Sequence, residues 1–306
     1  MKVEKYDIVV LGSINMDIMV TVSRFPQYGE TVFARTIQMT PGGKGANQAT
    51  AVARQGKKQL FLGAVGADSS GRQLLQELRA NGIDTSHVLI DGDHGTGTFV
   101  PIVDDDGENT MVGTLGANAT ISADYIDETL GAVEADVLLL QMETSRESIL
   151  AAMRKAKEKG MYVVLDPAPA DGFFPEALEL ADLVTPNQQE TERITGLSVI
   201  NQETALEAAR RLERLGVPNS VIKMGVHGNL IYQSGRVDIV PAHKVKVVNT
   251  VGAGDTFVAA LVSNYVETKD LVRAVECGNT AAAIKISRGT GQASIPTAEE
   301  IAAFPG

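Results

Sequence analysis

The sequence has little cysteine, no excess of basic charge and no long apolar run. Its 306 residues include one cysteine, Cys277, which excludes a disulfide framework within the chain and a zinc site of several thiolates. No apolar run approaches the ~18–20 residues that span a bilayer, and the N-terminus lacks the apolar core of a signal peptide. A net charge of -11 argues against a large nucleic-acid surface, because phosphate binding needs an excess of Lys and Arg. We therefore expect a cytoplasmic protein without membrane or nucleic-acid partners.

Short apolar segments alternate with predicted helices over much of the chain. Buried strands are predicted at residues 6–12, 136–141, 162–167, 182–187 and 220–225. Thr144 and Glu147 predict a capping box for the helix that follows the second of these strands, and Gly160 predicts its end. This alternation implies right-handed crossovers and a mostly parallel sheet, in which ligands bind beyond the carboxyl ends of the strands.

A second group of strands is predicted in two separate insertions. The first insertion contains residues 17–22 and 31–39, and the second contains a hairpin over residues 96–113 that turns at residues 105–108. A helical region near residues 44–55 lies between them. The two insertions together could form one small sheet.

Polar residues and glycine follow the predicted strands. Those just beyond the strand ends are Asn15, Glu143, Asp166, Asn187, Lys223 and Gly225. Each of them alone could be a turn former, since polar residues are common at strand ends. Because parallel sheets bind ligands beyond these ends, the group as a whole favours a binding site.

The stretch NTVGAGDTF (249–257) places a carboxylate between a glycine-rich turn and an apolar helix. Gly252 and Gly254 free the backbone to point several N–H groups one way, and the helix N-terminus attracts anions. Asp255 could be only an N-cap. A permanent anion repels a phosphate, however, so its place makes sense if it accepts the proton of an attacking hydroxyl. The amides of residues 252–255 would then stabilise charge on phosphate oxygens, and the reaction would be phosphoryl transfer to an alcohol.

A second glycine cluster, PGGKGANQATAVARQG, covers residues 41–56. Gly42 and Gly43 allow a ligand to approach the backbone closely, and Lys44 and Asn47 can hydrogen-bond a polyol. The cluster lacks the spacing of a Walker A loop, and it could instead be a hinge that starts a helix.

Four further stretches accompany the two glycine motifs: SINMD (13–17), DPAPA (166–170), TPNQQE (185–190) and SIP (294–296). From Gly12 to Pro296, these stretches resemble those of the ribokinases in the PfkB carbohydrate-kinase family. The resemblance implies a ribokinase-like three-layer α/β sandwich, with a mostly parallel sheet flanked by helices, in a single domain over residues 1–306. The insertions, about 13–41 and 95–115, would be a small β-sheet lid that closes over the sugar and makes a homodimer contact.

The same resemblance implies an ATP-dependent kinase that phosphorylates the O5 hydroxyl of D-ribose to give ribose 5-phosphate and ADP. The catalytic residues that it implies are Asp255 as general base and Gly252, Ala253 and Gly254 as anion hole. The implied sugar-binding residues are Asn15, Asp17, Gly42, Gly43, Lys44, Asn47, Glu143 and Asp255. The implied ATP-binding residues are Asn187, Lys223, Gly225, Gly228, Gly254 and Asn279. Asn187 and Glu190 would hold Mg2+ through water, as suits a cation that dehydrates reluctantly.

One position departs from this resemblance. Ribokinases activated by potassium usually carry Asp where this chain has Asn249, and the carboxylate coordinates the ion beside the anion hole. The residues that match this monovalent-cation site are Asn249, Val251, Gly289 and Ser294. Because Asn keeps an oxygen ligand but removes the formal charge, we expect weaker activation by potassium.

Two other classes of function match the sequence less well than a kinase does. A nicotinamide-dependent dehydrogenase should carry G-x-G-x-x-G after the first strand, and GSINMD does not match that pattern. A non-catalytic sugar sensor would lose the base or the magnesium residues, yet Asp255, Asn187 and Glu190 are all present. Among the kinases, fructose, 2-deoxyribose or a nucleoside could replace ribose as the substrate.

Overall fold

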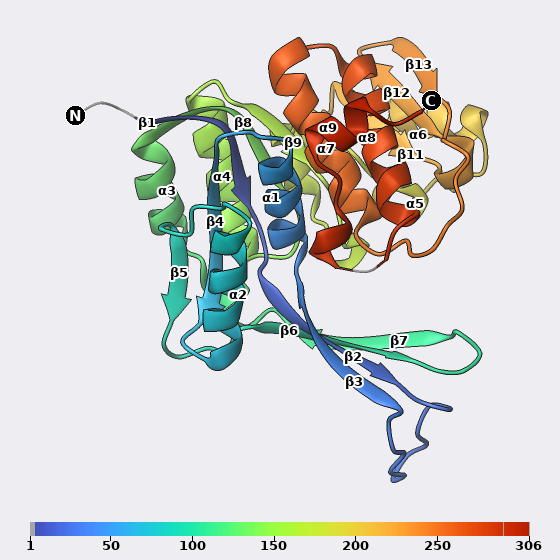
Figure 1. Ribbon diagram of the computed structural model, residues 1–306. Coiled ribbons are helices and arrows are strands. Elements are labelled where there is room, and N and C mark those ends of the chain that lie inside the picture. Colours follow the sequence, from blue (N-terminus) through green and yellow to red (C-terminus); the bar gives the residue numbers. More distant parts are fainter. Residues whose placement is uncertain (1–3, 290, 306) are drawn as a thin grey trace.

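Two β-sheets form the framework of the protein, and the computed structural model describes residues 4–289 and 291–305 (Figure 1). The strands of the larger sheet are β1 (Glu4–Leu11), β4 (Gln59–Gly66), β5 (Val88–Asp91), β8 (Val133–Leu140), β9 (Tyr162–Leu165), β10 (Leu183–Val184), β11 (Asn219–Lys223), β12 (Asn229–Gln233) and β13 (Arg236–Val240). The strands of the smaller sheet are β2 (Asn15–Thr21), β3 (Thr36–Gly42), β6 (Gly97–Val103) and β7 (Asn109–Thr114).

The larger sheet is mostly parallel. Its nine strands follow the order β13-β12-β11-β10-β9-β8-β1-β4-β5. Neighbours from β11 to β5 pair in parallel, whereas β12 pairs antiparallel with both β11 and β13 at one edge. The predicted α/β fold with a mostly parallel sheet and a small second sheet is confirmed.

Helices cover both faces of the larger sheet. They are α1 (Lys44–Arg54), α2 (Ser69–Ala80), α3 (Ala123–Gly131), α4 (Arg146–Glu158), α5 (Gln188–Thr195), α6 (Gln202–Arg214), α7 (Ala253–Thr268), α8 (Leu271–Ile286) and α9 (Ala298–Ala302). Because successive side chains of a strand point to opposite faces, Val9 and Leu11 of β1 pack with α3, α4 and α6, while Ile8 and Val10 pack with α1, α2, α7 and α8. Three layers with two apolar cores result. None of the helices in the described ranges is long and apolar enough to cross a membrane.

The smaller sheet joins the two insertions and extends away from the body of the protein (Figure 1). Its order is β3-β2-β6-β7, with β2 parallel to β6 and the other pairs antiparallel. The strand predicted at residues 31–39 begins only at Thr36, which pairs with Thr21 at the end of β2. Residues 31–35 are not part of a strand, although the Arg35 N–H donates to the Thr21 oxygen at 2.7 Å, and Phe33 is 91% exposed, so that part of the prediction is wrong.

The predicted capping box of α4 is also wrong. Ser145, one residue later, is the N-cap, and its hydroxyl accepts a hydrogen bond from the Ser148 N–H at 3.0 Å. The Thr144 hydroxyl instead accepts from the Ser148 side chain, and Glu147 accepts from the Ala123 N–H at the start of α3. Thr144 and Ser145 are both residue types that are favoured at an N-cap, so the sequence alone does not choose between them.

Candidate active site

Asp255 lies in the first turn of α7, beyond the carboxyl ends of the parallel strands. Gly252 is the N-cap of this helix, with a φ of 74° that favours glycine. Asp255 is therefore not an N-cap, and its carboxylate accepts hydrogen bonds from Asn47 at 3.0 Å and from Gln48 at 3.4 Å, both on α1. The first turn of a helix leaves backbone N–H groups without partners inside the helix. The Ala253 N–H of this turn donates to the Thr250 oxygen at 3.2 Å. The turn thus combines backbone amides with a carboxylate, 6% exposed, whose partners belong to another helix.

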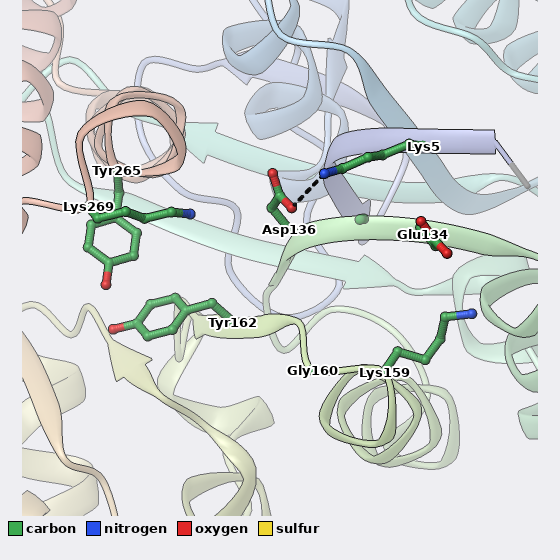
Figure 2. Close-up of a pocket in the computed structure, with 9 residues that line it drawn as sticks. Lys5, Glu134, Asp136, Lys159, Gly160, Tyr162, Tyr265 and Lys269 are labelled. Atoms are coloured by element: carbon green, nitrogen blue, oxygen red, sulfur yellow. Dashed lines mark ion pairs between the residues drawn. The ribbon is translucent and has the colours of Figure 1, made fainter.

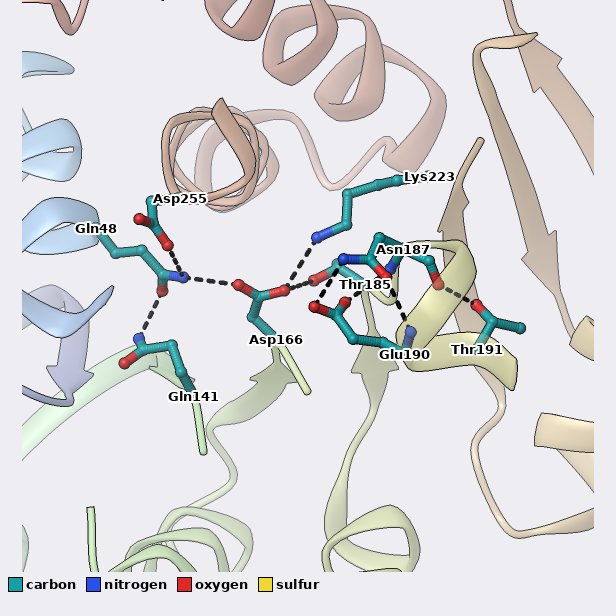
Figure 3. Close-up of polar contacts among 9 residues, drawn as sticks. All are labelled: Gln48, Gln141, Asp166, Thr185, Asn187, Glu190, Thr191, Lys223 and Asp255. Atoms are coloured by element: carbon teal, nitrogen blue, oxygen red, sulfur yellow. Dashed lines mark hydrogen bonds and ion pairs between the residues drawn. The ribbon is translucent and has the colours of Figure 1, made fainter. Parts of the chain in front are cut away.

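A chain of hydrogen bonds links Asp255 to the strands beneath it (Figure 3). The Gln48 amide also donates to Asp166 at 2.9 Å, and its oxygen accepts from Gln141 at 2.6 Å. Asp166, directly after β9, accepts in turn from the Lys223 ammonium at 3.1 Å. Gln48 therefore holds two buried carboxylates in fixed positions relative to one another.

Charges at this edge of the sheet change the protonation of the groups nearby. Burial raises the pKa of Asp255, while Lys44 and the hydrogen bonds from Asn47 and Gln48 oppose that shift. Burial alone would lower the pKa of Lys44, but the carboxylates of Asp255 and Glu143 raise it above its ordinary value. Lys44 is thus a fixed positive charge at the start of α1.

The predicted sugar-binding residues surround the same region. Glu143, after β8, accepts hydrogen bonds from the Ser13 hydroxyl at 2.6 Å and from the Lys44 N–H at 3.2 Å. Asn15 is 2% exposed, and its side-chain oxygen accepts from Asn118 at 2.8 Å. Asn118 lies far along the chain, so no local motif in the sequence points to it.

Gly42 and Gly43, which precede α1, have different roles. A Cβ at Gly42 would lie 2.1 Å from a carboxylate oxygen of Asp17, so the glycine leaves room for that side chain. Gly43 has a φ of 91°, and a Cβ there would lie 2.7 Å from the backbone oxygen of Ser13. Burial, and then the charge of Glu143, raise the pKa of Asp17 to about 6.

Asn187 and Glu190 form the capping box of α5. The Glu190 carboxylate accepts from the Asn187 backbone N–H at 2.7 Å and from its side-chain amide at 2.9 Å. Glu190 is 6% exposed, and burial raises its pKa despite the nearby ammonium of Lys223. Asn187 and Glu190 thus hold one another in place and present amide and carboxylate oxygens.

A cavity of 380 Å³ lies beside Asp255, between α7, α8 and the strand edge. Of the predicted ATP-binding residues, those that line it are Asn187, Lys223, Gly225, Gly254 and Asn279. Gly228 does not line it; a Cβ there would lie 2.2 Å from the backbone oxygen of Val240, so this close approach of the backbone requires glycine. Sequence reasoning did not find His243, Phe257 and Ile286 in the wall, since only tertiary packing brings them there.

A larger cavity of 550 Å³ opens at the opposite, amino-terminal ends of the parallel strands (Figure 2). It lies where β1, β8 and β9 begin, and Lys5 and Asp136 form an ion pair of 3.4 Å in its wall. Tyr162 stacks there on Tyr265, with ring centroids 4.9 Å apart. None of the predicted site residues lines this cavity.

The residues that match the monovalent-cation site already have local partners. The Asn249 side-chain oxygen accepts from the Val251 N–H at 2.8 Å, and the Ser294 hydroxyl donates to the Gly291 oxygen at 2.6 Å. The Val251 side chain and Gly289 are exposed. Asn249 therefore offers a neutral oxygen with one lone pair already engaged, which is a weaker cation ligand than a carboxylate.

The chain is similar to known carbohydrate kinases over nearly its whole length. Residues 5–298 match the family described as pfkB family carbohydrate kinase. The chain is 36% identical to a ribokinase of Haemophilus influenzae, over 96% of this chain and 97% of that protein. It is 31% identical to a deoxyribokinase of Salmonella typhi, over the same shares. The solved structure of Arabidopsis thaliana ribokinase complexed with ribose and ATP has a TM-score of 0.91 at 29% identity, and covers 98% of this chain and 100% of that chain.

Proposed function

The chain belongs to the pfkB family of carbohydrate kinases, and on that premise we propose that it transfers the γ-phosphoryl group of ATP to the O5 hydroxyl of D-ribose, giving ribose 5-phosphate and ADP. The observation that carries the proposal is the buried Asp255 carboxylate. It lies in a helix turn that attracts anions, it caps no helix, and its partner Asn47 is one of the predicted sugar-binding residues. On its other side, Gly254 lines the cavity assigned to the nucleotide.

In the proposed reaction, Asp255 accepts the proton of the O5 hydroxyl as that oxygen attacks the γ-phosphorus. The amides of Gly252, Ala253 and Gly254 stabilise the negative charge that develops on the phosphoryl oxygens. Lys44 adds a positive charge near the transferred group. Most of the rate enhancement would come from positioning and electrostatics.

Asn187 and Glu190 fit a magnesium ion held through water. Mg2+ takes oxygen ligands and keeps several waters, and the Glu190 carboxylate is already oriented by two hydrogen bonds from Asn187. When bound, the ion would neutralise charge on the β- and γ-phosphates. The proposal includes a cytoplasmic location, where ATP is available.

Substrate choice is tested by coupled detection of ADP release with ribose, 2-deoxyribose, fructose and adenosine as acceptors. Ribose should give the highest kcat/KM. 2-Deoxyribose is the second candidate, because one of the relatives named above is a deoxyribokinase. A higher value with another acceptor would change the proposed substrate, and no release with any acceptor would favour a non-catalytic sugar sensor.

Sugar binding should depend on pH through Asp17. The pKa of this carboxyl is raised to about 6, so the side chain loses its charge as the pH falls through that value. A neutral carboxyl is a poorer acceptor for sugar hydroxyls, so the KM for ribose should rise by up to about tenfold per pH unit below pH 6, and level off above it. Steady-state kinetics over this range measure the effect. The Asp17→Asn variant should lose this step in KM, and an unchanged step in that variant would contradict the role of Asp17.

We also propose that the smaller sheet is a lid and makes a homodimer contact through its apolar outer face. The register pairs Val20 with Ile37, and Ile18 with Met39. Ile37, Met39 and Val112 are 66%, 55% and 65% exposed. Asp17, on the opposite face of β2 from Ile18, would point toward the sugar. A continuous exposed apolar face marks an interaction site.

The homodimer is tested by Met39→Glu. A charged carboxylate in an apolar interface is costly, so we expect light scattering to give the mass of a monomer. Met111→Glu is the matched control, because Met111 is 61% exposed on the same sheet but next in sequence to Val112, and so points to the other face. If both variants keep the mass of the unmodified protein, the outer face is not the dimer contact.

A further inference from the structure

Lys285 is a buried lysine that the reaction described above does not use. It lies in the last turn of α8, and its residue surface is 2% exposed. Among the described residues, its ammonium has no hydrogen-bond partner. Burying an unpaired charge is costly, so a buried lysine without a partner is typical of a functional position.

The side chain of Lys285 lies against the anion-hole turn. A Cβ built on Gly252 would be 3.5 Å from the Lys285 Cε and 4.0 Å from its ammonium nitrogen. The segment before the turn is tied to the same end of α8, because the Val248 and Asn249 N–H groups donate to the Ile286 oxygen at 2.7 and 3.2 Å. Burial lowers the pKa of Lys285, and the charge of Asp255 opposes that shift.

Two features of the chain thus meet at one place. Position 249 carries a neutral amide whose oxygen is already hydrogen-bonded to Val251. Next to it, α8 brings a positive charge beneath the turn at Gly252. A neutral ligand and a nearby ammonium both disfavour a bound monovalent cation, whereas the ammonium itself supplies the same single charge.

We propose that Lys285 is a built-in replacement for a monovalent cation beside the anion hole, which makes the kinase independent of potassium. The inference rests on the proposed function. Lys285 is a positioning residue, since it acts on the amides of the turn and on the field around the transferred phosphoryl group. A charge fixed in place before the reaction needs no reorganisation when negative charge develops.

The first test compares the unmodified protein in potassium chloride and in tetramethylammonium chloride at equal ionic strength. We expect equal kcat in the two salts. Lys285→Met, which keeps an unbranched side chain but removes the charge, should lower kcat ~10-fold or more with little change in the KM for ATP. Lys246→Met, an exposed lysine in the segment before the turn, is the matched control and should behave like the unmodified protein.

A second test creates the cation site. The double variant Asn249→Asp, Lys285→Ala replaces the neutral amide at position 249 with a carboxylate and removes the ammonium at position 285. We expect potassium to raise both kcat and Tm of this variant, and tetramethylammonium to raise neither. The Tm series needs no substrate, so it tests the inference even if the protein phosphorylates none of the sugars. In that case the proposed function would fail while the response of Tm to potassium remained.

The inference is overturned if the unmodified protein requires potassium for turnover. It is equally overturned if Lys285→Met keeps full kcat, or if potassium stabilises the unmodified protein as much as the double variant. If Lys285→Met does not fold, two measurements still test the inference: the kcat of the unmodified protein in the two salts, and the response of the Tm of the double variant to potassium.

Discussion

Replacing Asp255 with Asn lowers kcat by about 10²–10⁴-fold and leaves ATP binding nearly unchanged, if this carboxylate is the general base. The amide keeps the shape of the side chain but cannot accept the proton of the sugar hydroxyl. The nucleotide cavity does not depend on this charge, since its walls come from Asn187, Lys223 and Asn279. The rate is measured by ADP release, and the affinity for ATP by calorimetry.

The control for this variant is Asp270→Asn. Asp270 also stands at a helix start, but it is the N-cap of α8 and accepts hydrogen bonds from the Val272 and Arg273 N–H groups. Asn is as good an N-cap as Asp, so activity and stability should both stay the same. If Asp255→Asn behaves like this control, Asp255 is structural and the proposed mechanism is wrong.

Replacing Gln48 with Leu should lower kcat by about 10–100-fold, because a buried hydrogen bond to a charged group contributes about 1.5–3 kcal/mol. Gln48 donates to both Asp255 and Asp166, and leucine would leave these two carboxylates facing an apolar group (Figure 3). The KM for ribose should change less, since Gln48 is fully buried and is not one of the predicted sugar-binding residues.

The pH profile separates this role from a purely structural one. The hydrogen bond from Gln48 lowers the pKa of Asp255, so its loss raises that pKa further. Because the base acts in its ionised form, the rise of kcat/KM with pH should move to higher pH in Gln48→Leu. The control is Gln73→Leu, because Gln73 is an exposed glutamine of α2 whose amide bonds Glu77 on the same helix. A lower rate with an unshifted profile would contradict the proposed coupling.

Local patterns in the sequence predicted the main layers of the fold and the residues at the strand ends. Short apolar segments become the strands of the larger sheet, and NTVGAGDTF forms a turn that starts a helix, as expected. The error at residues 31–35 has a physical cause, since β-branched and aromatic residues form a strand only where another strand lies beside them. In the structure, β2 ends at Thr21, so its pairing with β3 stops at Thr36 and at the bond from the Arg35 N–H to the Thr21 oxygen.

The residues that sequence reasoning missed are those whose role depends on contacts across the fold. Gln48 stands next to Asn47 in a motif that the sequence displays, but its bonds to Asp166 and Asp255 join three separate parts of the chain. Lys285 lies near the end of a largely apolar helix, and no motif in the local sequence marks it as a functional lysine. Only its burial against Gly252 does so.

The central claim is phosphoryl transfer from ATP to the O5 hydroxyl of ribose, and phosphorus NMR of the reaction mixture tests it most directly. We predict one sugar phosphate for each ADP formed, with its phosphorus coupled to the protons on C5 of the sugar. A phosphate on any other carbon, or ADP accompanied only by inorganic phosphate, would contradict the claim.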